Sequence, residues 1–101
     1  MDILIRIKRT VIAGNVVFTE KATTERERDN LTERDVIESI ITAVAIYKRI
    51  KSTNARSHGR EYLYIIQSTN FEGCLVYTKG KFVVDGGVAT YYILISAKRA
   101  I

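Results

Sequence analysis

Residues 74–99 read CLVYTKGKFVVDGGVATYYILISAKR, and this stretch decides the predicted fold. Two runs rich in β-branched and aromatic residues flank Asp85-Gly86-Gly87, and a glycine-containing turn between such runs predicts a β-hairpin. Gly80 inside the first run predicts a β-bulge. The second run, 88–99, is largely apolar on both faces, which predicts a central strand of a sheet.

Alternation along the first run separates its side chains into two sets. Tyr77, Lys79 and Lys81 share one face, whereas Val76, Phe82 and Val84 point to the other. A phenol and two ammonium groups on one sheet face indicate either a solvated surface or a site for a negatively charged ligand.

Two more strands are expected before the hairpin, in 45–52 (AIYKRIKS) and 61–68 (EYLYIIQS). A polar loop, 52–60, separates them, and a turn at 69–73 leads into the hairpin. The predicted strands would form an antiparallel meander of about four strands.

Sequence patterns in the first part of the chain predict helices. Apolar residues spaced by four between Asp2 and Gly14 indicate an amphipathic helix, although the β-rich ILIRI at 3–7 leaves a strand as the alternative. A short extended piece, VVFT at 16–19, follows. Helices before a meander are typical of an α+β domain, so we expect two to three helices packed on the sheet in one domain spanning 1–101.

Two further helices are marked by their caps. Thr19 can cap a helix at 20–29, which has Ala22 as its only apolar side chain and should lie at the surface; Asn30 suits its left-handed end. Thr32 and Asp35 resemble a capping box at the start of a helix over 33–44.

The charge is distributed unevenly. The chain of 101 residues carries a net charge of +5, but residues 1–44 have a balance of −1 and residues 45–101 a balance of +6. Such a basic half suits a polyanion or an acidic protein partner, and a surface kept basic for solubility is the alternative. With no signal peptide, no membrane-spanning segment and a single cysteine, Cys74, we expect a cytoplasmic protein without a membrane partner.

Several kinds of site are poorly supported. One histidine, His58, and one cysteine cannot supply a zinc site, and neither a phosphate-binding loop nor a nucleophile elbow is present. We therefore expect no metal and no cofactor. Cations and phenols remain, and together they are what a single-stranded RNA site requires, because cations bind phosphates and aromatic rings stack on unpaired bases. RNA can also be cleaved without a metal by Lys, Arg, Glu, His and Tyr side chains.

Two sets of motifs carry a family resemblance. IKRTVIAGNVVFT at 7–19, YK at 47–48 and ILISAKR at 93–99 resemble the MqsR family of type II toxin–antitoxin mRNA interferases. FTEKATTERERDNLTERDV at 18–36 is similar to the related BrnT families, with Lys21 at the family's histidine position, Glu25 at an arginine position and Asn30 at the turn glycine. The resemblance implies a curved, RelE-like sheet and a metal-independent endoribonuclease that cleaves mRNA.

The resemblance also implies site residues and partners. The catalytic residues would be Lys48 and Lys98 for phosphate binding and transition-state stabilisation, Glu61 as the base, and Tyr77 for stacking or proton transfer. The RNA-binding residues would be Arg56, His58, Arg60, Lys79, Lys81 and Arg99. The substrate would be mRNA, free or ribosome-bound, and an antitoxin with an acidic segment would neutralise the protein.

Other interpretations remain open at this point. Glu61 can simply pair with Arg60 or a cross-strand lysine, and Lys48 can extend from a half-buried position towards solvent. For the whole protein, the alternatives are a non-catalytic RNA- or ribosome-binding module, and an interaction domain that pairs a sheet edge with a partner strand.

Overall fold

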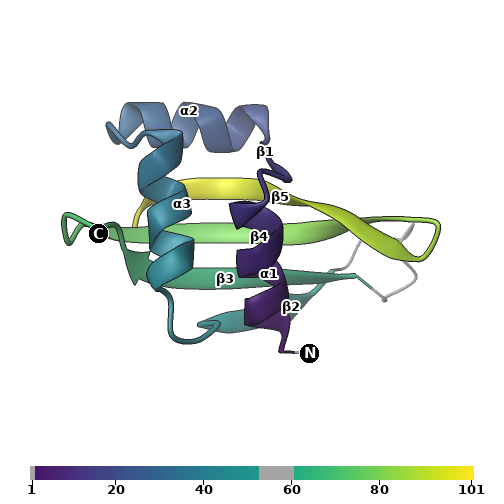
Figure 1. Cartoon of the computed structure of the whole chain (residues 1–101). Helices are drawn as coiled ribbons and strands as arrows, with labels where there is room; N and C mark the ends of the chain where they lie inside the picture. Colours follow the sequence, from purple (N-terminus) through teal and green to yellow (C-terminus); the bar gives the residue numbers. More distant parts are fainter. Residues whose placement is uncertain (1, 53–60) are drawn as a thin grey trace.

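The structure, a computed structural model, describes residues 2–52 and 61–101 (Figure 1). Three helices precede most of a five-stranded sheet, so the α+β class is confirmed. The elements are α1 (Ile3–Ile12), β1 (Val16–Phe18), α2 (Glu20–Arg28), α3 (Glu33–Thr42), β2 (Lys48–Lys51), β3 (Tyr62–Thr69), β4 (Leu75–Asp85) and β5 (Val88–Arg99). No helix in this described part is long and apolar enough to cross a membrane.

The sheet has the order β1-β5-β4-β3-β2 and is mixed, because β1 runs parallel to β5. The four predicted strands do form an antiparallel meander, β2 to β5, but the predicted strand number was wrong, because β1 adds a fifth strand and pairs in parallel. The three residues of β1 are too few to show an alternating pattern, and the chain after α1 uses them to pair with the outer edge of β5. The Asn15 carbonyl accepts from the Tyr92 N–H at 2.9 Å, and Thr19 N–H donates to the Leu94 carbonyl at 3.0 Å.

The helix boundaries follow the predicted caps. Asp2 accepts from the Leu4 N–H and starts α1, so the 3–12 segment is a helix and not a strand. Thr19 caps α2, and Thr32 with Asp35 forms a complete capping box for α3. Helix α3 ends at Thr42 rather than at residue 44. Asn30 has the expected left-handed conformation, with φ of 59°.

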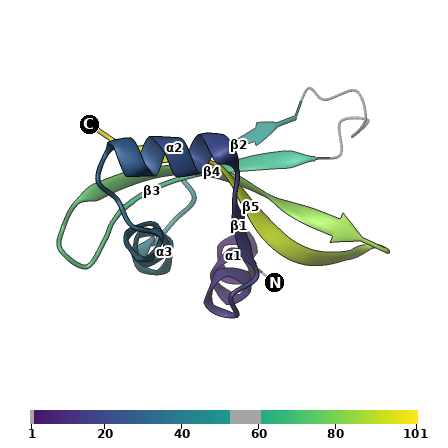
Figure 2. The ribbon, with the colours of Figure 1, turned by 90° about the horizontal axis from the view of Figure 1, so that it is seen from above.

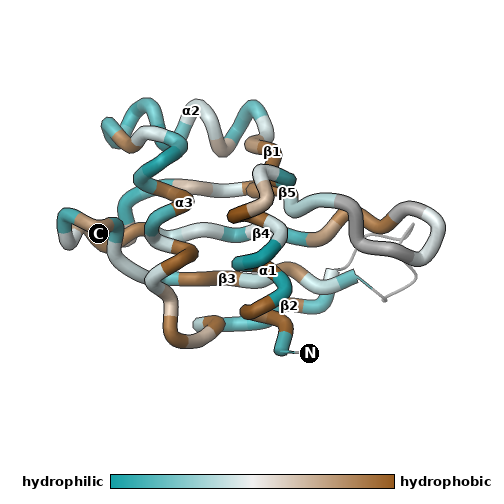
Figure 3. Tube along the Cα trace, in the orientation of Figure 1, coloured by the Kyte–Doolittle hydropathy of each residue, from teal (hydrophilic) through white to brown (hydrophobic). Residues whose placement is uncertain are grey.

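Helices α1 and α3 cross one side of the sheet, and α2 lies along β5 (Figures 1 and 2). Hydrophobic positions recur along α1 and α3 between hydrophilic ones (Figure 3). Burial of these apolar side chains against the sheet is the main force that holds the layers together. The buried core comprises Leu4, Ile7, Val11, Ala22, Leu31, Val36, Ile40, Ala43, Tyr64, Ile66, Val76, Tyr92, Leu94 and Ala97.

Most side chains of α2 lie at the surface, as predicted, but two of them are buried. Ala22 is fully buried, and Glu25 is 8% exposed. The small side chain of Ala22 lets the helix approach the sheet closely, and the Glu25 carboxylate finds its hydrogen-bond partners on β5.

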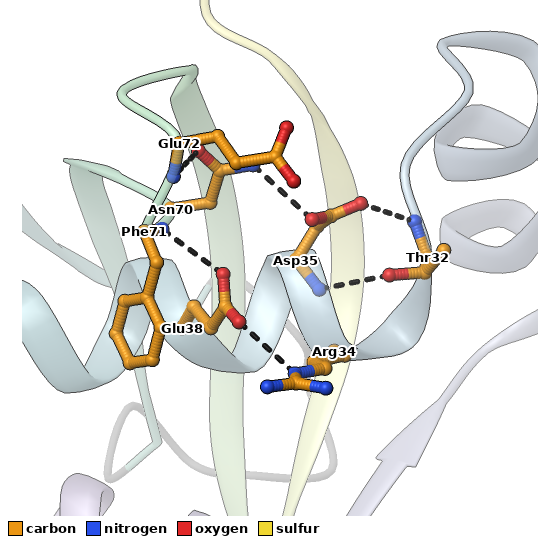
Figure 4. Close-up of polar contacts among 7 residues, drawn as sticks. All are labelled: Thr32, Arg34, Asp35, Glu38, Asn70, Phe71 and Glu72. Atoms are coloured by element: carbon orange, nitrogen blue, oxygen red, sulfur yellow. Dashed lines mark hydrogen bonds and ion pairs between the residues drawn. The ribbon is translucent and has the colours of Figure 1, made fainter.

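Polar contacts fasten α3 to the turn between β3 and β4 (Figure 4). Asn70 donates to Asp35 at 3.1 Å and accepts from the N–H groups of Glu72 and Cys74. Glu38 accepts from the Phe71 N–H at 2.9 Å. These contacts satisfy turn N–H groups at the end of the hairpin and so help to set the β3–β4 register.

The predicted bulge at Gly80 is present as a register shift between Lys79 and Gly80. The ring of Tyr92 lies directly over Gly80, so a Cβ atom at this position would meet Tyr92 ring atoms at 2.5 Å. Glycine is required here by the close approach of a buried ring rather than by backbone conformation.

Candidate nucleic-acid interface

The side of the sheet opposite α1 and α3, here named the open face, carries a regular pattern of side chains. Val76, Thr78 and Phe82 of β4 point into the core side, so the alternating residues of β4 point to the open face. Cross-strand pairing then assigns the neighbours. The open face comprises Lys48 and Ile50 of β2, Leu63, Ile65 and Gln67 of β3, Tyr77, Lys79, Lys81 and Val83 of β4, Tyr91, Ile93, Ser96 and Lys98 of β5, and Glu61 just before β3.

One row across the open face brings together three polar side chains. Tyr77 is paired with Gln67 on one side and with Lys98 on the other. The Lys98 ammonium lies 5.4 Å from the centroid of the Tyr77 ring, within the range of a cation–π contact. A phenol ring, an amide and a cation are therefore adjacent on the surface.

A second row lies beside the first, one pleat further along the strands. Lys48 is paired with Ile65, and Ile65 with Lys79. Ile65 is only 6% exposed although no helix covers it. This burial is expected if the alkyl stems of Lys48 and Lys79 cover the Ile65 side chain while their ammonium groups reach solvent.

Glu61 lies at the far end of the open face and does not join the other predicted catalytic residues. Its Oε1 atom is 3.1 Å from the Lys81 ammonium, as in the alternative of a cross-strand ion pair. Gln67, the partner of Tyr77, is six residues further along the chain from Glu61, which at about 3.3 Å per residue is roughly 20 Å. A base at Glu61 cannot reach a phosphate held at Tyr77 and Lys98, so the predicted catalytic quartet is not one compact site.

Two other predicted groups have different outcomes. Arg99 is paired with Val76, so it belongs to the side of the helices; its guanidinium donates to the Asp29 carbonyl and to Cys74 Sγ, each at 3.0 Å. Arg99 therefore does not share the open face with Lys98, because the side chains of successive strand residues alternate, and its role in RNA binding stays a prediction. The predicted residues Arg56, His58 and Arg60 lie outside the described residues.

Gln67 was missed by the sequence reasoning. We expected a polar residue from the start of the strand 61–68, whereas the register brings a residue near its end beside Tyr77. The length of the 69–73 turn and the alternation along both strands could have located Gln67, because a short hairpin loop fixes which residues face each other.

Helix α2 borders the open face through Glu25. The carboxylate accepts from Ser96 Oγ at 2.7 Å and from the Ala97 N–H at 3.2 Å. Burial raises the pKa of Glu25, but these hydrogen bonds and the nearby charges of Lys21 and Lys98 outweigh it, so the pKa lies below its ordinary value. Glu25 is therefore ionised at neutral pH and holds α2 against the strand that carries Lys98.

No group of three His, Cys, Asp or Glu side chains that could hold a metal ion occurs within the residues that the structure describes. Comparison with known proteins does not identify the chain: no family model matches it, and no curated protein or solved structure matches it significantly. The candidate interface thus rests on its own geometry, which is a broad basic face with one aromatic ring beside a cation.

Proposed function

We propose that the protein binds single-stranded RNA on the open face. The observation that carries the proposal is the two adjacent rows, in which Lys48, Lys79 and Lys98 lie on the same face as Tyr77, a face that α1 and α3 leave uncovered and that α2 only borders. Cations at this spacing can follow a phosphate backbone, and the exposed part of a tyrosine ring can stack on an unpaired base.

The electrostatics of this face favour an anionic chain. The strands of this face carry one carboxylate among the described side chains named above, Glu61, and Lys81 already neutralises it; the Glu25 carboxylate at its border is held by Ser96 and the Ala97 N–H. The half-buried aliphatic side chains Ile50, Leu63 and Ile93 lie between the cations. They offer apolar surface to bases and riboses, which a face kept basic only for solubility does not need.

Cleavage of the bound RNA is the second candidate function, and the Tyr77–Lys98 contact favours it. Lys98 would stabilise the charge that develops on the phosphorane, and Tyr77 would transfer a proton. Glu61 has no part in this version because of its distance from the pair. The reaction would be a metal-independent endonucleolytic cut, as the resemblance to MqsR-type interferases implies.

The same resemblance supplies the biological setting of the proposal. Helices followed by a twisted sheet with one basic, uncovered side suit a RelE-like fold, and such a toxin needs a neutralising partner. An acidic antitoxin segment would be attracted to the lysines of the open face and would exclude RNA from it. The sheet edge is a weaker alternative, because β2 carries Lys48, Arg49 and Lys51, and charges on an edge strand oppose strand addition.

A single assay tests binding and cleavage together. A fluorescein-labelled single-stranded RNA is incubated with the full chain in EDTA; binding is followed by anisotropy and cleavage by gel electrophoresis. We expect binding that weakens with salt, and Lys98→Gln to reduce both the affinity and any cutting. Arg34→Gln is the matched control, because it removes one cation from α3 on the other side of the sheet.

The outcomes separate the two functions. Intact but bound RNA leaves binding as the function and removes the nuclease. Cutting that persists in Lys98→Gln but disappears after further purification identifies a contaminant. RNA that does not bind even at low salt, or that binds equally well to Lys98→Gln and to Arg34→Gln, overturns the proposal.

A further inference from the structure

The sheet divides into two arms at one end. The last β3–β4 pair is Tyr64 with Gly80, yet β3 continues to Tyr62 in pairing with β2, and β4 continues to Asp85 in pairing with β5. Figure 2 shows the two arms diverging. A pocket of about 600 Å³ opens in the resulting fork, which is the size range of ligand sites in proteins.

Aromatic rings form much of the wall of this fork pocket. Its lining includes Arg6, Glu61, Tyr62, Tyr64, Lys81 and Phe82. Phe82 packs edge-to-face on Tyr64, with ring centroids 6.2 Å apart, and on Tyr92, 5.3 Å apart. These contacts hold Phe82 in one orientation, so the pocket has a rigid aromatic side suited to a flat ring.

A cation without an acidic partner stands over that wall. The Arg6 guanidinium of α1 lies 4.9 Å from the centroid of the Phe82 ring and is half-buried. Among the side chains that the structure describes, no carboxylate lies within ion-pair distance of Arg6. A partly desolvated guanidinium in a pocket, with donors left over, is a site for an anion.

The mouth of the fork holds a second cation, which is shared with the open face. Lys81 bridges the two arms through Glu61, with a distance of 3.1 Å between ammonium and carboxylate. Both side chains keep about a quarter of their surface exposed, 26% and 28%, so an incoming anion can reach the ammonium. In the free protein the Glu61 carboxylate thus occupies an anion position beside Lys81.

We propose that the fork pocket receives one nucleotide of the bound RNA strand, with its base against the aromatic wall and its phosphate between Arg6 and Lys81. This inference rests on the proposed RNA-binding function, because Lys81 makes the pocket continuous with the open face. Glu61 then competes with the phosphate for the Lys81 ammonium. It would weaken RNA binding in this role and would not serve as a catalytic base.

Two variants with opposite expected effects on RNA affinity test the pocket. Arg6→Gln removes a phosphate-binding cation and should weaken binding of a labelled 12-nucleotide RNA about 3- to 10-fold. Glu61→Gln removes the competing negative charge and should strengthen binding about 3-fold or more. Arg34→Gln and Glu72→Gln, both outside the fork, are the matched controls for the two changes of charge and should leave the affinity close to that of the unaltered chain.

A titration with the four nucleoside monophosphates locates the site independently of the RNA strand. In ¹H–¹⁵N spectra of the full chain we expect amide shifts at Arg6, Lys81 and Phe82, and their loss in Arg6→Gln. Thermal unfolding of each variant shows whether it is folded before it is compared.

The outcomes distinguish the pocket from the open face. If RNA binds but neither Arg6→Gln nor Glu61→Gln changes its affinity, the fork inference is wrong and the proposed function stands. If monophosphates bind in the fork but the RNA strand does not bind, the proposed function is wrong and the pocket is a nucleotide site. Weaker binding by Glu61→Gln contradicts the competitor role.

Discussion

The Lys98 ammonium and the Tyr77 ring lie 5.4 Å apart on paired positions of β5 and β4, on the side of the sheet away from α1 and α3. This contact holds a cation and an aromatic ring together before any ligand arrives. Register also places this pair beside Gln67 and far from Glu61. Glu61 therefore cannot act on a phosphate that is bound by Tyr77 and Lys98.

The first prediction concerns coupling between these two residues. Tyr77→Leu should cost about 1–3 kcal/mol of RNA-binding free energy by loss of stacking. Lys98→Gln should also weaken binding, and the double variant should lose less than the sum, since each residue orients the other. Anisotropy titrations of the unaltered chain, the two single variants and the double variant measure this double-mutant cycle. Phe71→Leu, a change to an exposed ring in the β3–β4 turn, should have little effect; strict additivity would show that the pair does not act together.

The second prediction concerns salt. If Lys48, Lys79, Lys81 and Lys98 each neutralise one phosphate, the logarithm of the RNA affinity should fall with the logarithm of salt concentration with a slope of about −3, because each contact in a single strand contributes roughly 0.7. Lys48→Gln and Lys79→Gln should each reduce that slope by about 0.7. A slope unchanged in both variants would remove these lysines from the interface, and Arg34→Gln again serves as the control.

The third prediction concerns pH. The pKa of Glu25 is lowered in the folded protein, so its ionised form stabilises the fold above the ordinary pKa of 4.5, and this contribution is lost as the pH falls through the lowered value. Glu25→Gln should cost about 1–3 kcal/mol at pH 7. Urea unfolding at decreasing pH should show the difference between the two proteins shrinking below pH 4.5. Glu27→Gln, at an exposed position of the same helix, should show neither effect.

The fourth prediction concerns the β3–β4 turn. Asn70→Ala removes side-chain hydrogen bonds to Asp35, Glu72 and Cys74 and should lower the free energy of unfolding by about 2–3 kcal/mol. The Thr32 N–H holds the pKa of Asp35 below its ordinary value, with Asn70 adding to the effect, so the loss should be largest at neutral pH. Denaturant unfolding measures it, and equal stability of Asn70→Ala and Glu72→Gln would contradict the role of the turn.

The fifth prediction concerns Gly80 and Tyr92. The Tyr92 hydroxyl is buried with no hydrogen-bond partner in the described structure, and burial raises its pKa, so Tyr92→Phe should be neutral or stabilising by up to about 1 kcal/mol. Gly80→Ala should destabilise by about 1–3 kcal/mol, because its methyl group meets the ring. The double variant should recover part of that loss, since the hydroxyl at 2.7 Å is one of the atoms met. Thermal unfolding of all three measures the set.

Local patterns in the sequence were sufficient for the helix caps, the hairpin and the bulge. Thr19, Thr32 with Asp35, and Asn30 act within a few residues of themselves, so their roles can be deduced without the fold, whereas the need for glycine at position 80 comes from the Tyr92 ring on β5. The same holds for the shared face of Tyr77, Lys79 and Lys81, because alternation along a strand is a property of the backbone.

Other features depend on which segments meet. The parallel pairing of β1 with β5, the burial of Ala22 and the distance of Glu61 from Tyr77 follow from strand order and register between residues far apart in the chain. The sequence alone determined which side chains share a strand face; only the tertiary structure decided which faces remain uncovered and which cations lie beside which rings. The physical reason is that alternation is set by neighbouring residues, whereas pairing is chosen by the burial of the whole core.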